Sequence, residues 1–458
     1  MSIIKYSKQF SSLVVLCLIA APSVSYSRDN SLIGGVSVGF DYSDRSGEGA
    51  DDADDAQQFV LSPMINFISL SERDSFELRA APGIKYDVKD SETDWDARLD
   101  VEADRFWTRT WQMGVSNRFI RSDYHDTVTR NFENPGDPLL EEIVLPTDPQ
   151  LSTDRGRRQY WRNTVGIFSN HFYQEDSLIG LNADYIVLRN DDTGFAGDED
   201  YDRYTVGVRN EHRYNAKWKS LMGVRYVLGD FEESDTFAGT PSDEELSDDV
   251  EEYYLDLAVE NNSIVNNPLT VSYNYIATRY EDDQQADSDI HEMRFTWRRD
   301  YSSRLYTSLG IGPTYEKTDG QSANWSENGI AEVNYTFQHG FVNFLIEKTY
   351  DVDNFSGSDE RGAVDRWDSQ LFGNYQLKKD IGLSGRLSYI NEDREQQDGN
   401  YQRDIYIAGT ALSYTFWQYY TASIDYTFTK QESDRIGDDY DDHRVLLTLS
   451  WQKELFRW

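Results

Sequence analysis

Cysteine is almost absent from this chain. Cys17 is the one cysteine, and it lies in a short apolar run at residues 13–21 that follows two lysines. Residues 25–27 (Ser-Tyr-Ser) have the small-x-small pattern of a cleavage site, so the beginning of the chain is typical of a secretory signal peptide. We therefore expect residues 1–27 to be a signal peptide and residues 28–458 to be the exported protein, without disulfide or thiol chemistry.

Positive charge is also scarce. The chain has 44 Lys and Arg against 82 Asp and Glu, a formal net charge of −38. Nucleic acid is therefore excluded as an expected partner, because phosphate binding needs clustered basic residues. Acidity alone would also fit a disordered chain, but 31 Tyr, 22 Phe and 11 Trp are far more aromatic residues than disordered chains carry.

Long hydrophobic runs are missing after residue 27. No apolar stretch there reaches the roughly 18 residues that a membrane-spanning helix needs. A chain can still span a membrane with strands if they close into a barrel, and mean hydropathy then stays low because only alternate residues face lipid.

Apolar and polar residues alternate with a period of two along most of the chain. In residues 420–429, Tyr420, Ala422, Ile424, Tyr426 and Phe428 share one face, and Thr, Ser and Asp occupy the other. The same pattern fills other segments: 76–86, 179–187, 269–277, 331–338 and 381–389. Each is close to the roughly 9–11 residues with which a tilted strand crosses a bilayer.

Short and long connections between these segments alternate. The short ones lie near residues 72–74, 108–109, 174–176, 216–217, 262–267, 301–303, 339–340, 379–380 and 418–419. The long ones lie near residues 45–57, 88–94, 121–157, 190–201, 231–250, 281–289, 317–325, 351–363, 392–401 and 431–441. Nine short and ten long connections predict about 20 strands, within a range of 18 to 22. The predicted fold is all-β: a single transmembrane antiparallel up-and-down β-barrel with short periplasmic turns and long acidic external loops.

Aromatic residues gather beside the short turns. They are Phe106, Trp107, Trp111, Phe172, Tyr173, Trp218, Phe337, Phe341, Phe416, Trp417, Tyr419 and Tyr420. Such rings favour the headgroup level of a bilayer, so they predict a periplasmic girdle, which a large soluble all-β protein would not need. The terminal Trp458 suits recognition by the barrel-assembly machinery, although the alternation breaks near Lys453 and Glu454.

Charged residues of both signs occupy the faces opposite the apolar ones. Because charge facing lipid costs a few kcal/mol, we expect these residues to line the lumen: Arg79, Asp96, Arg98, Asp100, Glu102, Asp184, Arg209, Arg225, Asp256, Arg294, Glu332, Arg386 and Asp425. A hydrated lumen of this kind suits polar or saccharide solutes. The alternative is that the charges pair across strands and only stabilise the wall.

The longest loop, residues 121–157, is unusually apolar. It holds four prolines together with Phe132, Leu139, Leu140, Ile143, Val144 and Leu145. Apolar residues on an external loop need cover, so we expect the loop to fold inward as a constriction. Packing against a neighbouring loop at the rim is the alternative.

No motif indicates catalysis, a cofactor or a bound metal. The six His residues lack metal-ligand spacing, and phosphate-loop, dinucleotide and nucleophile-elbow motifs are missing. Acidic clusters such as residues 51–55 and 438–442 are best explained as solvated surface, with divalent bridging to lipopolysaccharide as the alternative. The triplet Asp441-Asp442-His443 is the one feature that points toward a barrel enzyme, because acidic residues beside a His near a barrel rim can activate water.

The chain resembles the outer-membrane β-barrel porin family often encoded in exopolysaccharide gene clusters. The resemblance rests on residues 59–63 (Phe-Val-Leu-Ser-Pro), the turn at 71–75, and the C-terminal segments 426–429 and 444–451 around an acidic loop. It implies a conduit for a secreted polysaccharide that works with periplasmic export proteins. The acidic balance favours a neutral polymer over an anionic one.

We therefore expect an outer-membrane channel of a Gram-negative bacterium, surrounded by lipid and lipopolysaccharide, that secretes an exopolysaccharide. The alternatives are a general diffusion porin for small polar solutes and a surface or adhesive barrel without transport. A barrel enzyme is a further alternative that we do not favour.

Overall fold

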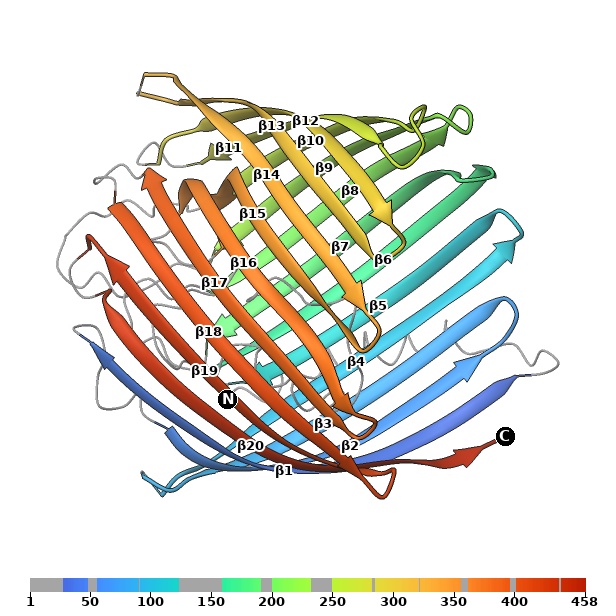
Figure 1. The fold of residues 1–458 in the computed structure, drawn as a ribbon, viewed down its shortest axis with the longest axis vertical. Coiled ribbons are helices and arrows are strands. Elements are labelled where there is room, and N and C mark those ends of the chain that lie inside the picture. Colours follow the sequence, from blue (N-terminus) through green and yellow to red (C-terminus); the bar gives the residue numbers. More distant parts are fainter. Residues whose placement is uncertain are drawn as a thin grey trace.

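The computed structural model describes 11 segments of the chain: residues 28–47, 56–89, 91–122, 159–190, 200–231, 249–281, 285–320, 322–355, 361–395, 401–435 and 438–458. They form one sheet of 20 strands (Figure 1). The strands are β1 (Asp29–Gly47), β2 (Ala56–Leu70), β3 (Asp74–Asp87), β4 (Thr93–Thr108), β5 (Trp111–Ser122), β6 (Tyr160–Gln174), β7 (Ser177–Asn190), β8 (Tyr201–Arg213), β9 (Trp218–Phe231), β10 (Val250–Asn261), β11 (Leu269–Tyr280), β12 (Ser288–Ser302), β13 (Leu305–Thr318), β14 (Asn324–Phe337), β15 (Gly340–Asp353), β16 (Gly362–Lys378), β17 (Ile381–Glu395), β18 (Tyr401–Phe416), β19 (Tyr420–Ser433) and β20 (Tyr440–Arg457).

The sheet closes on itself. Each strand pairs antiparallel with its neighbours in chain order, and β20 pairs with β1 from Ser31 opposite Arg457 to Gly47 opposite Tyr440. Closure removes the free edges that an open sheet would leave. The predicted all-β barrel of 20 antiparallel strands is thereby confirmed. Among the described residues, no helix has the length and apolar character needed to cross a membrane.

The two ends of the barrel differ. Nine connections of two to seven residues lie at one end, which we call the turn end, and the C-terminus lies there too (Figure 1). The other end, the loop end, carries ten connections of 5 to 37 residues, the longest of them between Ser122 and Tyr160. The alternation of short and long connections matches the prediction.

Side chains cap several short turns. The Ser71 hydroxyl accepts hydrogen bonds from the backbone N–H groups of Arg73 and Asp74, at 3.2 and 3.0 Å. The Asn215 carbonyl oxygen accepts from the N–H groups of Lys217 and Trp218 in the same way, at 2.8 and 3.2 Å. Ser and Asn favour turns because their side chains satisfy such backbone donors.

A β-bulge accounts for the broken alternation near the C-terminus. Leu32 pairs with Phe456, but Ile33 pairs with Glu454, so Leu455 is the extra residue on β20. One inserted residue reverses the faces of the residues that follow it.

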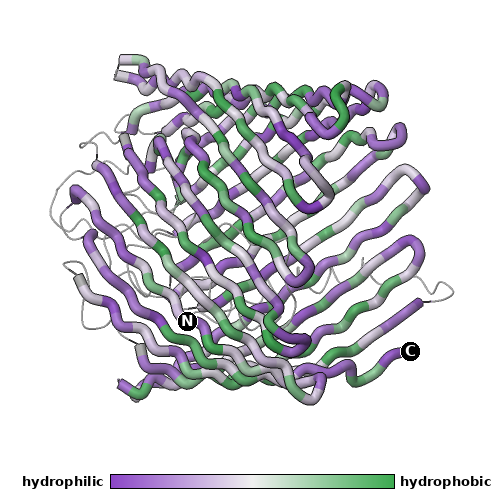
Figure 2. Tube along the Cα trace, viewed as in Figure 1, coloured by the Kyte–Doolittle hydropathy of each residue, from purple (hydrophilic) through white to green (hydrophobic). Residues whose placement is uncertain are grey.

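The barrel is apolar outside and polar inside. Ile311 and Val206, at mid-strand, are 68% and 55% exposed on the outer face, whereas Ser37 and Glu292 on the inner face are at most 5% exposed. The tube in Figure 2 shows this alternation along the strands. It is the reverse of a water-soluble protein, in which large exposed apolar surfaces are avoided.

Aromatic residues mark both ends of the outer face. At the turn end, the exposed rings include Trp107, Trp111, Tyr173, Trp218 and Trp417, as the sequence predicts. Phe341, also predicted for this girdle, is instead buried on the inner face, because its side chain alternates with the exposed Val342. A second belt near the loop end was not predicted. It contains Tyr86, Trp95, Tyr204, Tyr253, Trp325, Trp367, Tyr406 and Tyr426, and its rings contact neighbours on adjacent strands. Two belts that border an apolar band are typical of membrane barrels.

Candidate functional site

The register places all the charged residues predicted for the lumen on the inner face. Those residues alternate with the exposed apolar residues of their strands: Arg79, Asp96, Arg98, Asp100, Glu102, Asp184, Arg209, Arg225, Asp256, Arg294, Glu332, Arg386 and Asp425. That they line a conducting pore stays a prediction.

Many of these inner charges are paired. Asp100 lies between two arginines, 2.6 Å from the Nε of Arg98 and 2.9 Å from the Nε of Arg118. Asp96 is 2.6 Å from the Lys85 Nζ, one strand away. Part of the inner wall is therefore held by charge pairs within and between strands, as the alternative interpretation of these residues expects. It is also hydrated in places, because the Arg118 side chain is 52% exposed.

The interior differs between its two halves. Near mid-barrel and toward the turn end, inner-face residues such as Glu102, Arg209 and Arg225 are exposed. At the loop end, inner-face residues of β5 to β10 are buried in one apolar cluster together with Phe355: Ile120, Tyr160, Ile186, Leu188, Tyr201, Val227, Phe231 and Val250. The inner face is thus exposed near mid-barrel and partly covered near the loop end.

Phe355 enters this cluster from the connection between β15 and β16. Its ring lies 5.2 Å from the ring of Tyr201 and 5.6 Å from that of Phe231, measured between centroids. The Arg203 guanidinium lies 4.9 Å from the Phe355 ring centroid, and that of Arg361 lies 3.9 Å from the Phe231 ring. The tip of the β15–β16 hairpin therefore crosses the lumen to β8 and β9.

Polar contacts fix the same tip to β10 and β11. The Asn354 amide donates to Glu252 at 2.6 Å, and its carbonyl oxygen accepts from the Tyr280 hydroxyl at 2.5 Å. Tyr254 also donates to Glu252, at 2.8 Å. Asn354 and Glu252 are almost fully buried, so each depends on the other for its hydrogen bonds.

The arms of the hairpin also lie inside the barrel. Tyr350 lies on the same face of β15 as Val342, which is exposed on the outer surface nearer the turn end. Tyr350 is nevertheless buried in a cluster with Ile290, an inner-face residue of β12, and Ile276 and Val352 pack against that cluster. The outer face of β15 therefore packs on the inner face of β11 and β12. We call residues 349–355 and 361–366 the inner hairpin.

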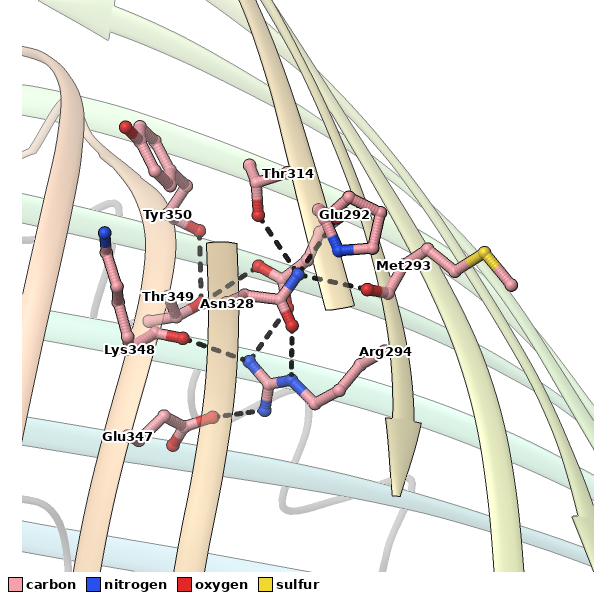
Figure 3. Close-up of polar contacts among 10 residues, drawn as sticks. Glu292, Met293, Arg294, Thr314, Asn328, Glu347, Lys348, Thr349 and Tyr350 are labelled. Carbon is pink, nitrogen blue, oxygen red and sulfur yellow. Dashed lines mark hydrogen bonds and ion pairs between the residues drawn. The ribbon is translucent and has the colours of Figure 1, made fainter. Parts of the chain in front are cut away.

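The wall is also interrupted between β12 and β13, near the inner hairpin. The β12–β13 ladder runs to Glu292 opposite Thr314 and resumes at Phe295 opposite Ile311. Pro313 lies in this gap and lacks the N–H that a continuous ladder would use. Asn328 fills the gap, and its amide donates to the carbonyls of Met293 and Pro313, both at 3.1 Å (Figure 3).

Arg294 joins this gap to the inner hairpin. Its guanidinium donates to Asn328 at 3.0 Å, to Glu347 at 2.6 Å and to Glu292 at 2.8 Å (Figure 3). The same group donates to the backbone carbonyl of Lys348 at 3.4 Å. Arg294, predicted as a lumen residue, thus bridges β12 to β15 across two intervening strands.

Asn328→Ala is expected to destabilise the barrel by about 1–3 kcal/mol, because it leaves two buried carbonyls without a donor. The urea dependence of unfolding from lipid vesicles measures this change. Asn334→Ala is a matched control on the same strand, since the Asn334 side chain makes only a 3.5 Å contact with Thr336. Equal unfolding midpoints for the two variants would contradict this role for Asn328.

The predicted constriction loop lies outside the described residues, so the placement of Phe132, Leu139, Leu140, Ile143 and Leu145 stays a prediction. The inner hairpin was not predicted. Its signal in the sequence is Phe355, an aromatic residue in a connection that is otherwise acidic and polar.

Asp442 and His443 do not form a site together. Asp442 lies on the inner face, where it accepts from the Ser43 hydroxyl at 2.9 Å. His443 lies on the outer face, where its Nδ1 is 3.0 Å from the Tyr426 hydroxyl and its ring is tilted against that of Phe428. Within the described part of the chain, no group of three or more His, Cys, Asp or Glu residues is arranged to hold a metal ion.

Searches with family models and among curated proteins found no match. Solved structures do match. A mutant of the ferric enterobactin receptor PfeA from Pseudomonas aeruginosa, in complex with enterobactin, is 11% identical, covering 92% of this chain and 81% of that chain with a TM-score of 0.53. The siderophore receptor PirA of the same organism is 12% identical, covering 92% and 80%, with a TM-score of 0.50. The P. aeruginosa protein OccK2 is 13% identical and covers 92% and 98%, with a TM-score of 0.44, which is too low to bear on function. At these identities, what this chain shares with the two receptors is the fold of a large closed β-barrel.

Proposed function

We propose that this chain is an outer-membrane channel through which small polar solutes diffuse. The observation that carries the proposal is the distribution of polarity about a closed 20-stranded sheet: an exposed apolar band outside and charged residues inside. In hydrocarbon every backbone group must be paired within the protein, and a closed barrel meets that need. The two aromatic belts suit the two headgroup layers, and barrels of this kind are typical of bacterial outer membranes.

The lumen suits polar solutes. Barrels of 16–18 strands already leave an aqueous channel, and this barrel has 20 strands. Exposed charges of both signs, such as Glu102, Arg118 and Arg209, keep its middle hydrated. An apolar solute would gain little from such a wall.

The proposed solutes are small polar molecules, whereas the sequence analysis expects an exopolysaccharide. A polysaccharide conduit is supported only by the family resemblance of a few short segments. A polymer also needs a lumen continuous at both ends, and the inner hairpin fills part of the loop end. We therefore place the diffusion channel for small polar solutes ahead of the exopolysaccharide conduit.

Cation preference is expected from the charge of the chain. Acidic residues outnumber basic ones by 82 to 44, so the potential in the lumen should favour cations. In planar bilayers with a KCl gradient, the reversal potential should have the sign of a cation-selective channel, and it should shrink as salt screens the charges. Swelling of proteoliposomes in small sugars tests passage of neutral polar solutes. Anion selectivity, or folded barrels that pass neither ions nor sugars, would contradict the proposal.

A further inference from the structure

We infer that the inner hairpin is a gate: it closes the lumen by leaving the barrel wall, and it opens the lumen by pairing with β14. The inference rests on the proposed channel function. It is carried by an incomplete ladder, by the sequence of the strand that left the wall, and by the contacts that hold that strand inside.

The ladder between β14 and β15 stops early. It runs from Phe337 opposite Gly340 to Gly329 opposite Lys348. Both strands continue for five more residues, all of them described, yet no rung joins the two extensions. Continuing the same register would pair Asn328 with Thr349 and Asn324 with Asp353, and those last two residues are where the strands end. The two extensions therefore match in length and register, as strands built to pair would.

The sequence of the β15 extension suits the barrel wall. Thr349, Asp351 and Asp353 alternate with Tyr350 and Val352, and the latter two lie on the face that points outward nearer the turn end. In the wall, Tyr350 and Val352 would face lipid in the loop-end aromatic belt, close to Trp325 and Trp367. In the structure they pack instead on Ile276 and Ile290. The same alternation of polar and apolar residues therefore suits this extension both in the barrel wall and inside the barrel.

The hairpin can move as a unit. Its two arms stay paired as far as Asp353 opposite Gly362, and β16 stays paired with β17 as far as Ala363 opposite Glu395. Movement would therefore swing the loop ends of β15 to β17 outward and leave their own ladders intact. Only the discontinuity at β14–β15 would change its pairing.

Side chains hold the closed arrangement. Thr349 donates to Glu292 at 3.3 Å, Arg294 donates to the Lys348 carbonyl at 3.4 Å, and Asn354 donates to Glu252 at 2.6 Å. These polar contacts hold the arm inside the barrel, where the backbone rungs that pairing with β14 would form are missing. Exchange of one set for the other leaves few polar groups without partners, so the closed state can be the favoured one while the open state is still visited as a minor population.

Engineered thiol pairs test the gate, and a mature chain without cysteine needs no background substitution. Ser326→Cys with Asp351→Cys joins residues that face each other only in the extended register, and it should trap the open state. Ile290→Cys with Tyr350→Cys, bridged by a short bis-maleimide, should trap the closed state. Ile276→Cys with Val352→Cys is a second closed pair in case the first fails to fold. Ser384→Cys with Ala411→Cys is the control, since those residues face each other in an uninterrupted ladder.

In membranes, oxidation should cross-link the 326–351 pair and raise the mean current per channel. Bridging a closed pair should lower that current, and the control pair should cross-link without changing it. If the control pair cross-links and the 326–351 pair does not, or if the bridged closed pair conducts like the wild type, the gate is refuted. If both pairs cross-link as expected on a gel and no variant conducts, the hairpin movement stands and the channel function fails.

Discussion

Replacing Phe355 by Ala is expected to increase the mean current through the channel by an order of magnitude or more. Phe355 is 6% exposed and packs against Tyr201 and Phe231 at the loop end of the lumen. Removing a buried phenylalanine side chain typically costs about 3–5 kcal/mol, and about 1.4 kcal/mol changes an equilibrium tenfold. Because these contacts exist only when the hairpin lies inside, their loss favours the open state. Planar-bilayer recordings measure the fraction of time that each channel is open.

The control for this variant is Phe344→Ala. Phe344 lies on β15, the strand that leads into the connection carrying Phe355, but it is 40% exposed on the outer face, so its loss should leave the open fraction unchanged. Both variants should fold with similar yield, because neither residue takes part in closing the sheet. A Phe355→Ala channel with the wild-type open fraction would show that the hairpin does not control conduction.

Replacing Ile424 by Arg is expected to destabilise the folded barrel in lipid by about 2–4 kcal/mol, the cost of a basic side chain facing the bilayer midplane. Ile424 lies near the middle of β19 and is 46% exposed on the outer face. The measurement is the denaturant dependence of folding into phospholipid vesicles.

Ser423→Arg is the matched control, one residue away on the opposite face. Ser423 donates to Asp425 at 3.1 Å, so an arginine there lies beside a carboxylate on the polar inner face. Its cost should be a small fraction of that for Ile424→Arg. If both substitutions cost the same, or if the inner one costs more, the assignment of the two faces would be wrong.

The strand number and the two faces could be predicted because the physical signal is local. A strand with one apolar face alternates with period two, as in residues 420–429, and a turn interrupts that period. Charges such as Asp100 and Arg225 could be assigned to the inner face for the same reason. The bulge at Leu455 appeared in the sequence only as a break in alternation. One extra residue shifts the alternation of the two faces, but the sequence does not show which residues of the neighbouring strand lie opposite it.

The inner hairpin could not be predicted from alternation. Tyr350 and Val352 have the pattern of residues that face lipid, and the same pattern also serves a strand that packs on Ile276 and Ile290. Periodicity shows that a strand has an apolar face, but it does not show whether lipid or another strand covers that face, because this depends on the tertiary structure. Pro313 marks the gap between β12 and β13, and Phe355 marks the tip of the inner hairpin, but each becomes informative only once its neighbours in the fold are known.

Current recordings of single wild-type channels in planar bilayers test the central claim most directly. The account predicts cation-selective currents that switch between a low level, with the inner hairpin in the lumen, and a high level, with the hairpin in the wall. The high level should match the current of the oxidised Ser326→Cys/Asp351→Cys channel. Folded barrels that stay at one level in every recording, or that never conduct, would contradict it.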